Sequence, residues 1–418
     1  MGRIRRSFVA VFAAAAGAAG GLSVGEVAAQ VARDPAGALV SRLDLERYKA
    51  TIRGLTQFGD RRQGTQRNRD AVTWIEAQLR SYGCSNTERL TYIFPTPPDP
   101  SVPRPGPIPG PTLAAASDAL VTEVRRGREG GSTQFGNRAV TGVNRDPLRQ
   151  PDERLRALNE EIPPTEPGAR QQVYCTKVGS VRPDEMYIVG AHMDGHGYGE
   201  AANDDGSGTA LVMELARILS APDVRTQRSI RFILWNNEET GLDGSRAYVA
   251  QRRRLQGVEN PPGSGLYPEP RWLGMVTHDM MMFDHGMPSA AGSVGSEQLP
   301  EADVDIEYQS TSAMAEASQA LADVFKLASD RYNTDFPASV GPHMTNTDSV
   351  PFMDLVPSIS LRENERGKEI GAGWNPHWHQ PTDLYATYSD ADFTLGLNAA
   401  QTTLAALARL TGATLAEP

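Results

Sequence analysis

The strongest constraint on this chain is a regular alternation of apolar runs and helical patterns in its middle third. Three short apolar runs bounded by turn residues have the length of buried strands, at residues 186–191, 229–235 and 272–277. Between them, apolar residues recur at helical spacing over 207–219 and 242–254. This alternation predicts an α/β fold with a mostly parallel, twisted central sheet and helices on both faces.

Further elements flank this middle part. We expect two N-terminal helices between residues 43 and 82, strands at 87–94 and 171–177, and long helices at 311–332 and 393–410. The proline density that begins at Pro95 rules out a helix or a central strand there. We therefore expect one domain over residues 30–418, with a Pro/Gly-rich surface insertion at about 95–170 that contains one short helix at 153–158.

Charge and cysteine content exclude some classes of protein. The formal net charge is −10, which argues against a nucleic-acid partner because phosphate binding needs clustered Lys and Arg. Cys84 and Cys175 are the two cysteines of the chain, and two thiolates cannot build a thiolate zinc site. They form either a disulfide that ties neighbouring strands or two buried free thiols. Any metal is therefore held by histidine and carboxylate.

Histidine and acidic residues come directly after the ends of three expected strands. His192 and Asp194 come after the first strand of the middle part, Glu238 and Glu239 after the second, and Asp279 after the third. Functional groups of open parallel sheets collect beyond the carboxyl ends of the strands. Each signal is weak alone, but together they predict one site.

The residue types fit a pair of zinc ions. All seven histidines lie at or after His192, and zinc accepts imidazole and carboxylate where thiolate is absent. Asp204, in a loop of small residues, suits a carboxylate that bridges two metals. Asp194 would hold the His192 imidazole from behind. Two Zn²⁺, three carboxylates and one hydroxide sum to zero charge.

The ordered set of motifs resembles a known family. The chain contains, in order, His-x-Asp, Asn-Asp-Asp-Gly-Ser-Gly, Glu-Glu, Asp-Met and His-x-x-x-Asp. This order resembles the co-catalytic di-zinc exopeptidases, which include secreted bacterial aminopeptidases, glutamate carboxypeptidase-like enzymes and glutaminyl cyclases. The resemblance implies a three-layer zinc-exopeptidase sandwich and a metalloprotease that acts on a peptide substrate.

The resemblance also assigns roles. It implies that His192 and Asp279 bind one zinc, that Glu239 and His379 bind the other, and that Asp204 bridges both. Glu238 corresponds to the general base that activates a metal-bound hydroxide. His377 competes with His379 for the ligand role, and we favour His379 because Asp383 follows it in the His-x-x-x-Asp pattern.

Several functions remain compatible with these residues. An aminopeptidase that removes N-terminal residues is the function we expect. A carboxypeptidase-like enzyme and a glutaminyl cyclase-like enzyme with one zinc use the same fold. A non-catalytic binding ectodomain is the alternative from another class, and the intact Glu238 and ligand set argue against it.

The N-terminus has the pattern of an export signal. Arg3, Arg5 and Arg6 precede an apolar Ala/Gly-rich run, and Val27-Ala28-Ala29 offers a cleavage point before Gln30. The run is too short and too glycine-rich for a stable membrane span, so we expect cleavage of residues 1–29 and a periplasmic or secreted enzyme. The Arg5-Arg6 pair leaves open either the general secretory or the twin-arginine route.

Overall fold

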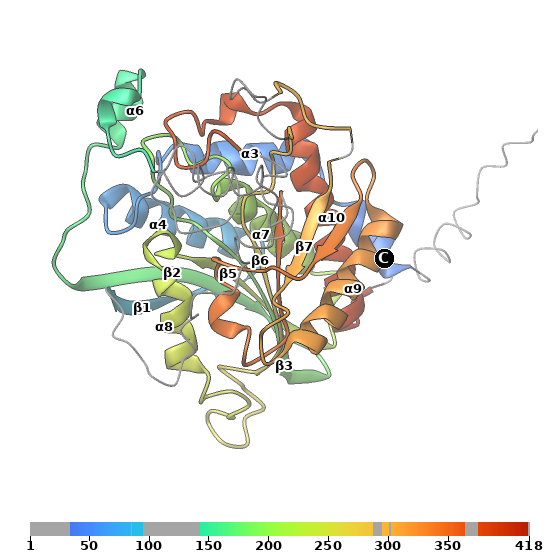
Figure 1. Cartoon of the computed structure of the whole chain (residues 1–418). Coiled ribbons are helices and arrows are strands. Elements are labelled where there is room, and N and C mark those ends of the chain that lie inside the picture. The colour runs from blue at the N-terminus through green and yellow to red at the C-terminus, as the bar shows by residue number, and fades with distance from the viewer. Residues whose placement is uncertain are drawn as a thin grey trace, which may run out of the picture.

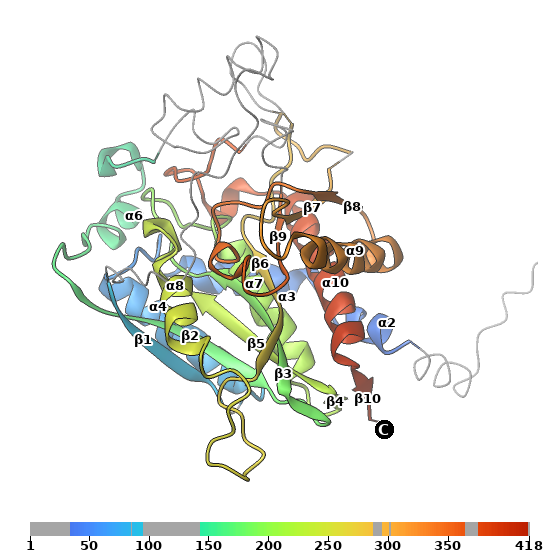
Figure 2. The same cartoon turned by 60° about the horizontal axis from the view of Figure 1, so that its bottom comes forward.

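A mixed, mostly parallel sheet of eight strands runs through the centre of the computed structural model (Figures 1 and 2). The structure describes residues 34–84, 86–94, 143–286, 295–300, 302–363 and 375–416. In spatial order the strands are β1 (Glu88–Phe94), β2 (Gly168–Lys177), β5 (Arg228–Trp235), β3 (Arg182–His192), β6 (Arg271–His278), β9 (Ser358–Arg362), β7 (Val304–Tyr308) and β8 (Ala338–Gly341).

The central strands are parallel and the outer pairings are mixed. β3 pairs in parallel with both β5 and β6, and β6 pairs in parallel with β9. The pairs β1–β2, β2–β5 and β7–β9 are antiparallel. The carboxyl ends of β5, β3, β6 and β9 therefore meet along one edge of the sheet.

Helices precede, connect and follow these strands. Their bounds are α2 (Pro35–Val40), α3 (Leu45–Thr56), α4 (Gln66–Ser81), α6 (Glu153–Leu158), α7 (Gly206–Leu219), α8 (Asp243–Arg252), α9 (Ala315–Tyr332) and α10 (Asp390–Thr411). Short 3-10 turns are η3 (Pro147–Arg149), η4 (Glu238–Thr240), η5 (Val350–Phe352) and η7 (Tyr385–Thr387), and β4 (Val224–Arg225) pairs with β10 (Thr414–Leu415).

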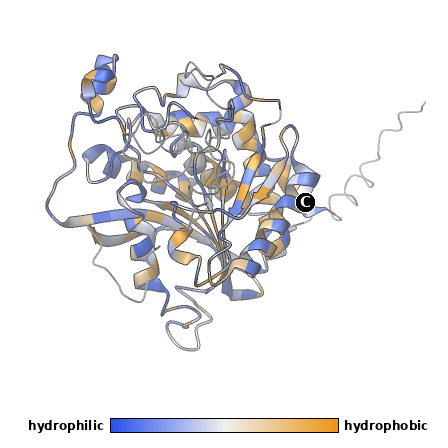
Figure 3. Cartoon of the chain, viewed as in Figure 1, coloured by the Kyte–Doolittle hydropathy of each residue, from blue (hydrophilic) through white to orange (hydrophobic). Residues whose placement is uncertain are grey.

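Side chains of the central strands are buried on both faces. In β3, Val189 and Ala191 join the larger hydrophobic cluster, which contains residues of α3, α4, α7, α9 and α10. Met186 and Ile188 point the other way into a second cluster under α8. Burial on both faces explains why these strands are continuous apolar runs. Figure 3 shows apolar residues along the inner strands and mixed colours along the outer helices.

Local capping signals set the starts of the helices. The Asp44 side chain accepts a hydrogen bond from Arg47 N at 2.9 Å and so begins α3. Ser389 and Asp392 form a capping box that begins α10, and Gly412 ends it in the left-handed conformation at φ 64°. These caps explain why the predicted helices have nearly the observed bounds.

The α/β architecture, the central strands and the predicted helices are confirmed, but helix α2, the short β4–β10 pair and three strands of the central sheet were not predicted. β7, β8 and β9 have five, four and five residues. Runs this short carry too little periodicity to be told from loops. Their place in the sheet depends on pairing with β6 and with one another.

The insertion is only partly described. Its short helix is α6, as predicted, and β2 begins at Gly168. Residues 95–142 and the expected signal at 1–29 lie outside the described residues. Among the helices that the structure does describe, none is both long and apolar enough to cross a bilayer.

A disulfide joins Cys84 to Cys175, with the two Cα atoms 5.9 Å apart. β1 and β2 pair so that Glu88, the first residue of β1, lies opposite Tyr174. This pairing brings Cys84, which precedes β1, close to Cys175 in β2. The bond fixes the segment between α4 and β1 to β2, the neighbour of the edge strand β1. Of the two alternatives left open by the sequence, the structure contains the disulfide.

Replacing both cysteines by serine should destabilise the fold, because the bond closes a loop with a sequence separation of 91. A loop of that length corresponds to a loss of about 2 to 5 kcal/mol in the free energy of unfolding. Urea denaturation of wild type and of the double variant measures it, and reduced wild type is the control. Two titratable thiols in denatured, non-reduced wild type would contradict the bond.

Candidate metal centre

The carboxyl ends of three parallel strands place most of the expected residues. β3 ends at His192, β6 ends one residue before Asp279, and Glu238 and Glu239 form the η4 turn just after β5. Asn237 takes the left-handed conformation at φ 65°. Its side-chain oxygen accepts a hydrogen bond from Tyr92 Oη at 2.8 Å, which helps to fix the turn.

Asp204 reaches the same place from the loop before α7. Asp383 holds this loop, because its carboxylate accepts hydrogen bonds from Asn203 N at 2.9 Å and from Asp204 N at 3.1 Å. Asp205 points away from the site and accepts from His192 N, Gly208 N and Met280 N at 2.9–3.1 Å. One aspartate of the pair thus faces the site, and the other ties β3, β6 and α7 together.

The first group of donors surrounds His192 Nε2. This nitrogen lies 3.2 Å from Asp204 Oδ1 and 3.7 Å from Asp279 Oδ1. His192 Nδ1 donates to the backbone oxygen of Asp194 at 2.9 Å, so Nε2 is left free to bind a metal. Nearby carboxylates, Glu238 foremost, outweigh the effect of burial and raise the pKa of His192 well above its usual range.

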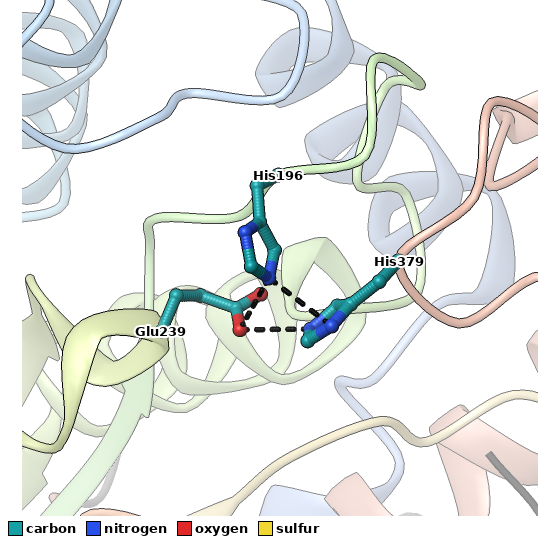
Figure 4. A group of neighbouring side chains, drawn as sticks. All are labelled: His196, Glu239 and His379. Carbon is teal, nitrogen blue, oxygen red and sulfur yellow. Dashed lines mark hydrogen bonds and ion pairs between the residues drawn. The ribbon is translucent and has the colours of Figure 1, made fainter. Parts of the chain in front are cut away.

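The second group contains Glu239, His379 and His196 (Figure 4). His379 Nε2 lies 2.7 Å from Glu239 Oε2 and 3.0 Å from Asp204 Oδ2. His196 Nε2 lies 3.0 Å from the same Glu239 oxygen and 3.1 Å from His379 Nδ1. The sequence analysis assigned no role to His196, although a further histidine four residues after His192 was a visible signal.

His377 lies outside both groups. Its Nδ1 is 2.9 Å from Thr382 Oγ1, and its ring packs edge-on against Phe283 and Tyr388. Between the two histidines that compete in the sequence, His379 is the one that the fold brings to the carboxylates.

Asp194 contacts the site differently from what we expected. Its Oδ1 lies 4.0 Å from His192 Nδ1 and accepts a hydrogen bond from Glu238 N at 3.2 Å. The imidazole is oriented mainly by the Asp194 backbone oxygen, while the carboxylate fixes the backbone of Glu238. Burial raises the pKa of Asp194 to about 7.

Three further residues near the site were missed by the sequence analysis. Arg362, at the end of β9, lies 2.6 Å from Asp279 Oδ2, and Glu363 accepts hydrogen bonds from Asn203 Nδ2 at 2.7 Å and Phe283 N at 2.7 Å. Asp348 is fully buried, and burial raises its pKa to about 7. Arg362 ends the unpredicted strand β9 and Glu363 directly follows it, so no sequence signal placed them.

The site contains many acidic side chains with little access to solvent, which is electrostatically unfavourable without compensating positive charge. Among the described residues, the cluster and its immediate supports contain eight buried carboxyl groups, the partly buried Glu239 and two buried guanidinium groups: Asp194, Asp204, Asp205, Glu238, Asp279, Asp348, Glu363 and Asp383, against Arg61 and Arg362. Burial raises the pKa of Glu238 well above its usual range, with Asp279 and Glu239 adding to the shift. A bound cation relieves such an excess of negative charge.

The donor set fits zinc. All donors are imidazole nitrogens or carboxylate oxygens, the types that zinc binds without thiolates. His379 Nε2 lies within ion-pair distance of two carboxylate oxygens, yet it and Glu239 Oε1 make no hydrogen bond of normal geometry within the described part of the chain. Buried polar atoms of this kind are normally satisfied, and a metal ion would satisfy both.

A cavity of about 540 Å³ opens beside the second group. Asp194, His196 and Glu239 of the site line it together with Arg62 and with residues that include Val143, Asn144, Arg145, Ile162 and Pro163. Residues 143–165 belong to the insertion, so this segment forms part of the rim of the site. The cavity supplies room for a small substrate next to the acidic cluster.

Comparisons with known proteins agree on one family. The model of peptidase family M28 matches residues 173–400, more than half of the chain. A probable lipoprotein aminopeptidase, LpqL of Mycobacterium tuberculosis, is 28% identical over 239 residues, which cover 56% of this chain and 44% of the relative. The aminopeptidase YwaD of Bacillus subtilis is 45% identical over 67 residues, 16% of this chain and 14% of the relative. The chain thus matches less than half the length of either relative.

Solved structures share the fold. An aminopeptidase from Aneurinibacillus sp. strain AM-1 superposes with a TM-score of 0.55 at 20% identity, covering 91% of this chain and 97% of that one. BSAP, a zinc aminopeptidase from Bacillus subtilis, gives 0.53 at 17% identity over 88% and 95% of the two chains. At this identity the likeness concerns the architecture alone.

The two neighbouring histidines can be separated by metal content. We expect His379→Ala to lose one zinc per chain, because its nitrogen faces two carboxylates, and His377→Ala to keep wild-type zinc, because it faces a hydroxyl and aromatic rings. Zinc is counted by plasma emission after dialysis against metal-free buffer. Wild-type zinc in His379→Ala together with loss in His377→Ala would reverse the assignment.

Proposed function

The chain belongs to peptidase family M28, and from this premise we propose that it is an exported, zinc-dependent aminopeptidase. The observation that carries the proposal is the convergence of five donors from distant parts of the chain around one acidic cluster: His192, Asp204, Glu239, Asp279 and His379. They are the residues that the motif order assigns to a zinc pair, and Glu238 lies among them.

We propose two zinc sites that share Asp204. His192 and Asp279 would hold one ion and Glu239 and His379 the other, with one Asp204 oxygen directed to each side: Oδ1 lies 3.2 Å from His192 Nε2 and Oδ2 lies 3.0 Å from His379 Nε2. Zinc at such a site lowers the pKa of water and polarises a carbonyl. This chemistry is that of peptide hydrolysis.

Glu238 is the proposed general base. It takes a proton from the attacking water and passes it to the leaving amine. The hydrogen bond from its backbone N to Asp194 Oδ1 fixes its position. Among the described residues, a group of three possible ligands places Glu238 with His192 and Asp279, within reach of water bound there.

The choice of an aminopeptidase rests on the relatives. LpqL and YwaD both carry that name, and the cavity beside Glu239 accommodates a short peptide end. Export is supported by the basic and apolar N-terminal segment and by the description of LpqL as a lipoprotein aminopeptidase. Cleavage before Gln30 remains a prediction of the sequence.

Two adjacent acids test the proposal, because their neutral amide variants should fail in different ways. Glu239→Gln should weaken the binding of one zinc ion, since an amide oxygen is a poorer zinc ligand than a carboxylate. Glu238→Gln should keep both zinc ions but lose roughly 10²-fold to 10⁴-fold in kcat, the usual scale for a positioned proton-transfer group. Zinc counting and hydrolysis of leucine 4-nitroanilide separate the two.

N-acetyl-leucine 4-nitroanilide is the matched control substrate for the same wild-type enzyme. An aminopeptidase should not cleave it, since it lacks the free amine. Equal cleavage of the blocked and free substrates would refute the aminopeptidase, and near-normal turnover by Glu238→Gln would remove Glu238 from the mechanism.

A further inference from the structure

His196 has no role in the proposed ligand set, yet it is one of the three side chains of the second donor group (Figure 4). Its Nε2 is 3.0 Å from Glu239 Oε2 and 3.1 Å from His379 Nδ1. Donors around a tetrahedral zinc at roughly 2.0–2.1 Å stand roughly 3.3 Å from one another. His196 therefore stands from Glu239 at nearly the spacing of two ligands of one metal.

The backbone around His196 is built to keep the ring there. Gly195 and Gly197 flank it, and a Cβ on Gly197 would lie 2.5 Å from the carbonyl carbon of His379. A Cβ on Gly195 would lie 2.6 Å from Ala201 Cβ and 2.9 Å from Asp204 O. Only glycines permit this close approach of the loop to the backbone of two expected ligands.

The insertion fastens the same loop to the segment that carries His379. Asn144 donates from its backbone N to His379 O and from its side chain to Gly197 O, both at 3.0 Å. Gln150 Nε2 donates to Tyr198 O at 2.8 Å and to Pro381 O at 2.9 Å. Four hydrogen bonds thus fix the loop of His196 relative to the loop of His379, as a rigid metal site requires.

We propose that His196 is a third side-chain ligand of the second zinc, beside Glu239 and His379. The inference rests on the proposed zinc pair and extends it. With the shared Asp204, the second zinc would have four protein donors, whereas the first would have three: His192, Asp279 and Asp204. Four donors close a zinc site and three leave a position open for water and substrate.

This difference in the number of donors should make the two sites differ in zinc affinity. The second site, with its four donors His196, Glu239, His379 and Asp204, would bind zinc more tightly than the first. The first site, with three protein donors, would keep one position open. Zinc should therefore bind in two distinguishable steps.

Zinc affinity tests the inference without any activity measurement. Competition of the metal-free wild type with a chromophoric chelator should resolve a tight and a weaker site. His196→Ala should lower the zinc affinity of the tight site by more than roughly 100-fold. Loss of a residue that only hydrogen-bonds to a ligand lowers metal affinity by roughly 10-fold to 100-fold. His377→Ala is the matched control, because His377 lies in the neighbouring loop but outside the cluster. It should leave the zinc dissociation constants of both sites unchanged.

A second measurement on the wild type does not depend on the folding of a variant. X-ray absorption at the zinc edge of the two-zinc enzyme counts imidazole ligands, and we expect three imidazoles shared by the two ions. Two shared imidazoles, or a His196→Ala protein with both constants unchanged, would overturn the role of His196 while leaving the zinc pair intact. A wild type that binds no zinc would instead refute the proposed function.

Discussion

The organisation of this protein depends on negative charge concentrated at the carboxyl ends of parallel strands. β3, β5 and β6 each end beside an acid or a histidine, and parallel pairing brings these ends together. Isolated buried carboxylates are very unfavourable unless they are neutralised, hydrogen-bonded or bound to a cation. The chain uses backbone N–H donors for some of them, as at Asp205 and Asp383, and places others against histidines, as at Asp204.

Buried cations offset part of this charge and fix the loops around it. Arg61 is fully buried, and its guanidinium donates to the backbone oxygens of Met193, Glu200 and Ala201 at 2.7–2.8 Å. It holds the loop that carries Asp194 and Asp204. Arg362 binds the outer oxygen of Asp279 and leaves the other oxygen toward His192. The supports thus determine which carboxylate oxygens face the proposed metals.

The sequence predicted the parts of the site that strand ends determine. His192, Glu238, Glu239 and Asp279 follow short apolar runs, and the length of these runs and the turn residues that bound them identified them as buried strands. The small residues of its loop singled out Asp204, and the resemblance in motif order then supplied the roles of Asp204 and His379, which both come from loops. The central architecture followed from the same runs.

The rest depends on contacts that no local pattern records. β9 is five residues long, and its register beside β6 decides that Arg362 reaches Asp279. His196 reaches Glu239 because glycines let its loop lie against the backbone of His379. Apart from its short helix the insertion gave no periodic signal, yet Asn144 and Gln150 bridge the two loops of the second donor group. Such tertiary contacts became visible only in three dimensions.

The central claim is that the acidic cluster is a site for two zinc ions bridged by Asp204. Anomalous diffraction from crystals of the zinc-loaded protein, recorded on both sides of the zinc absorption edge, tests it most directly. The account predicts two peaks, one within coordination distance of His192 and Asp279, the other of Glu239 and His379, and both next to Asp204. A single peak, or zinc bound away from Asp204, would contradict it.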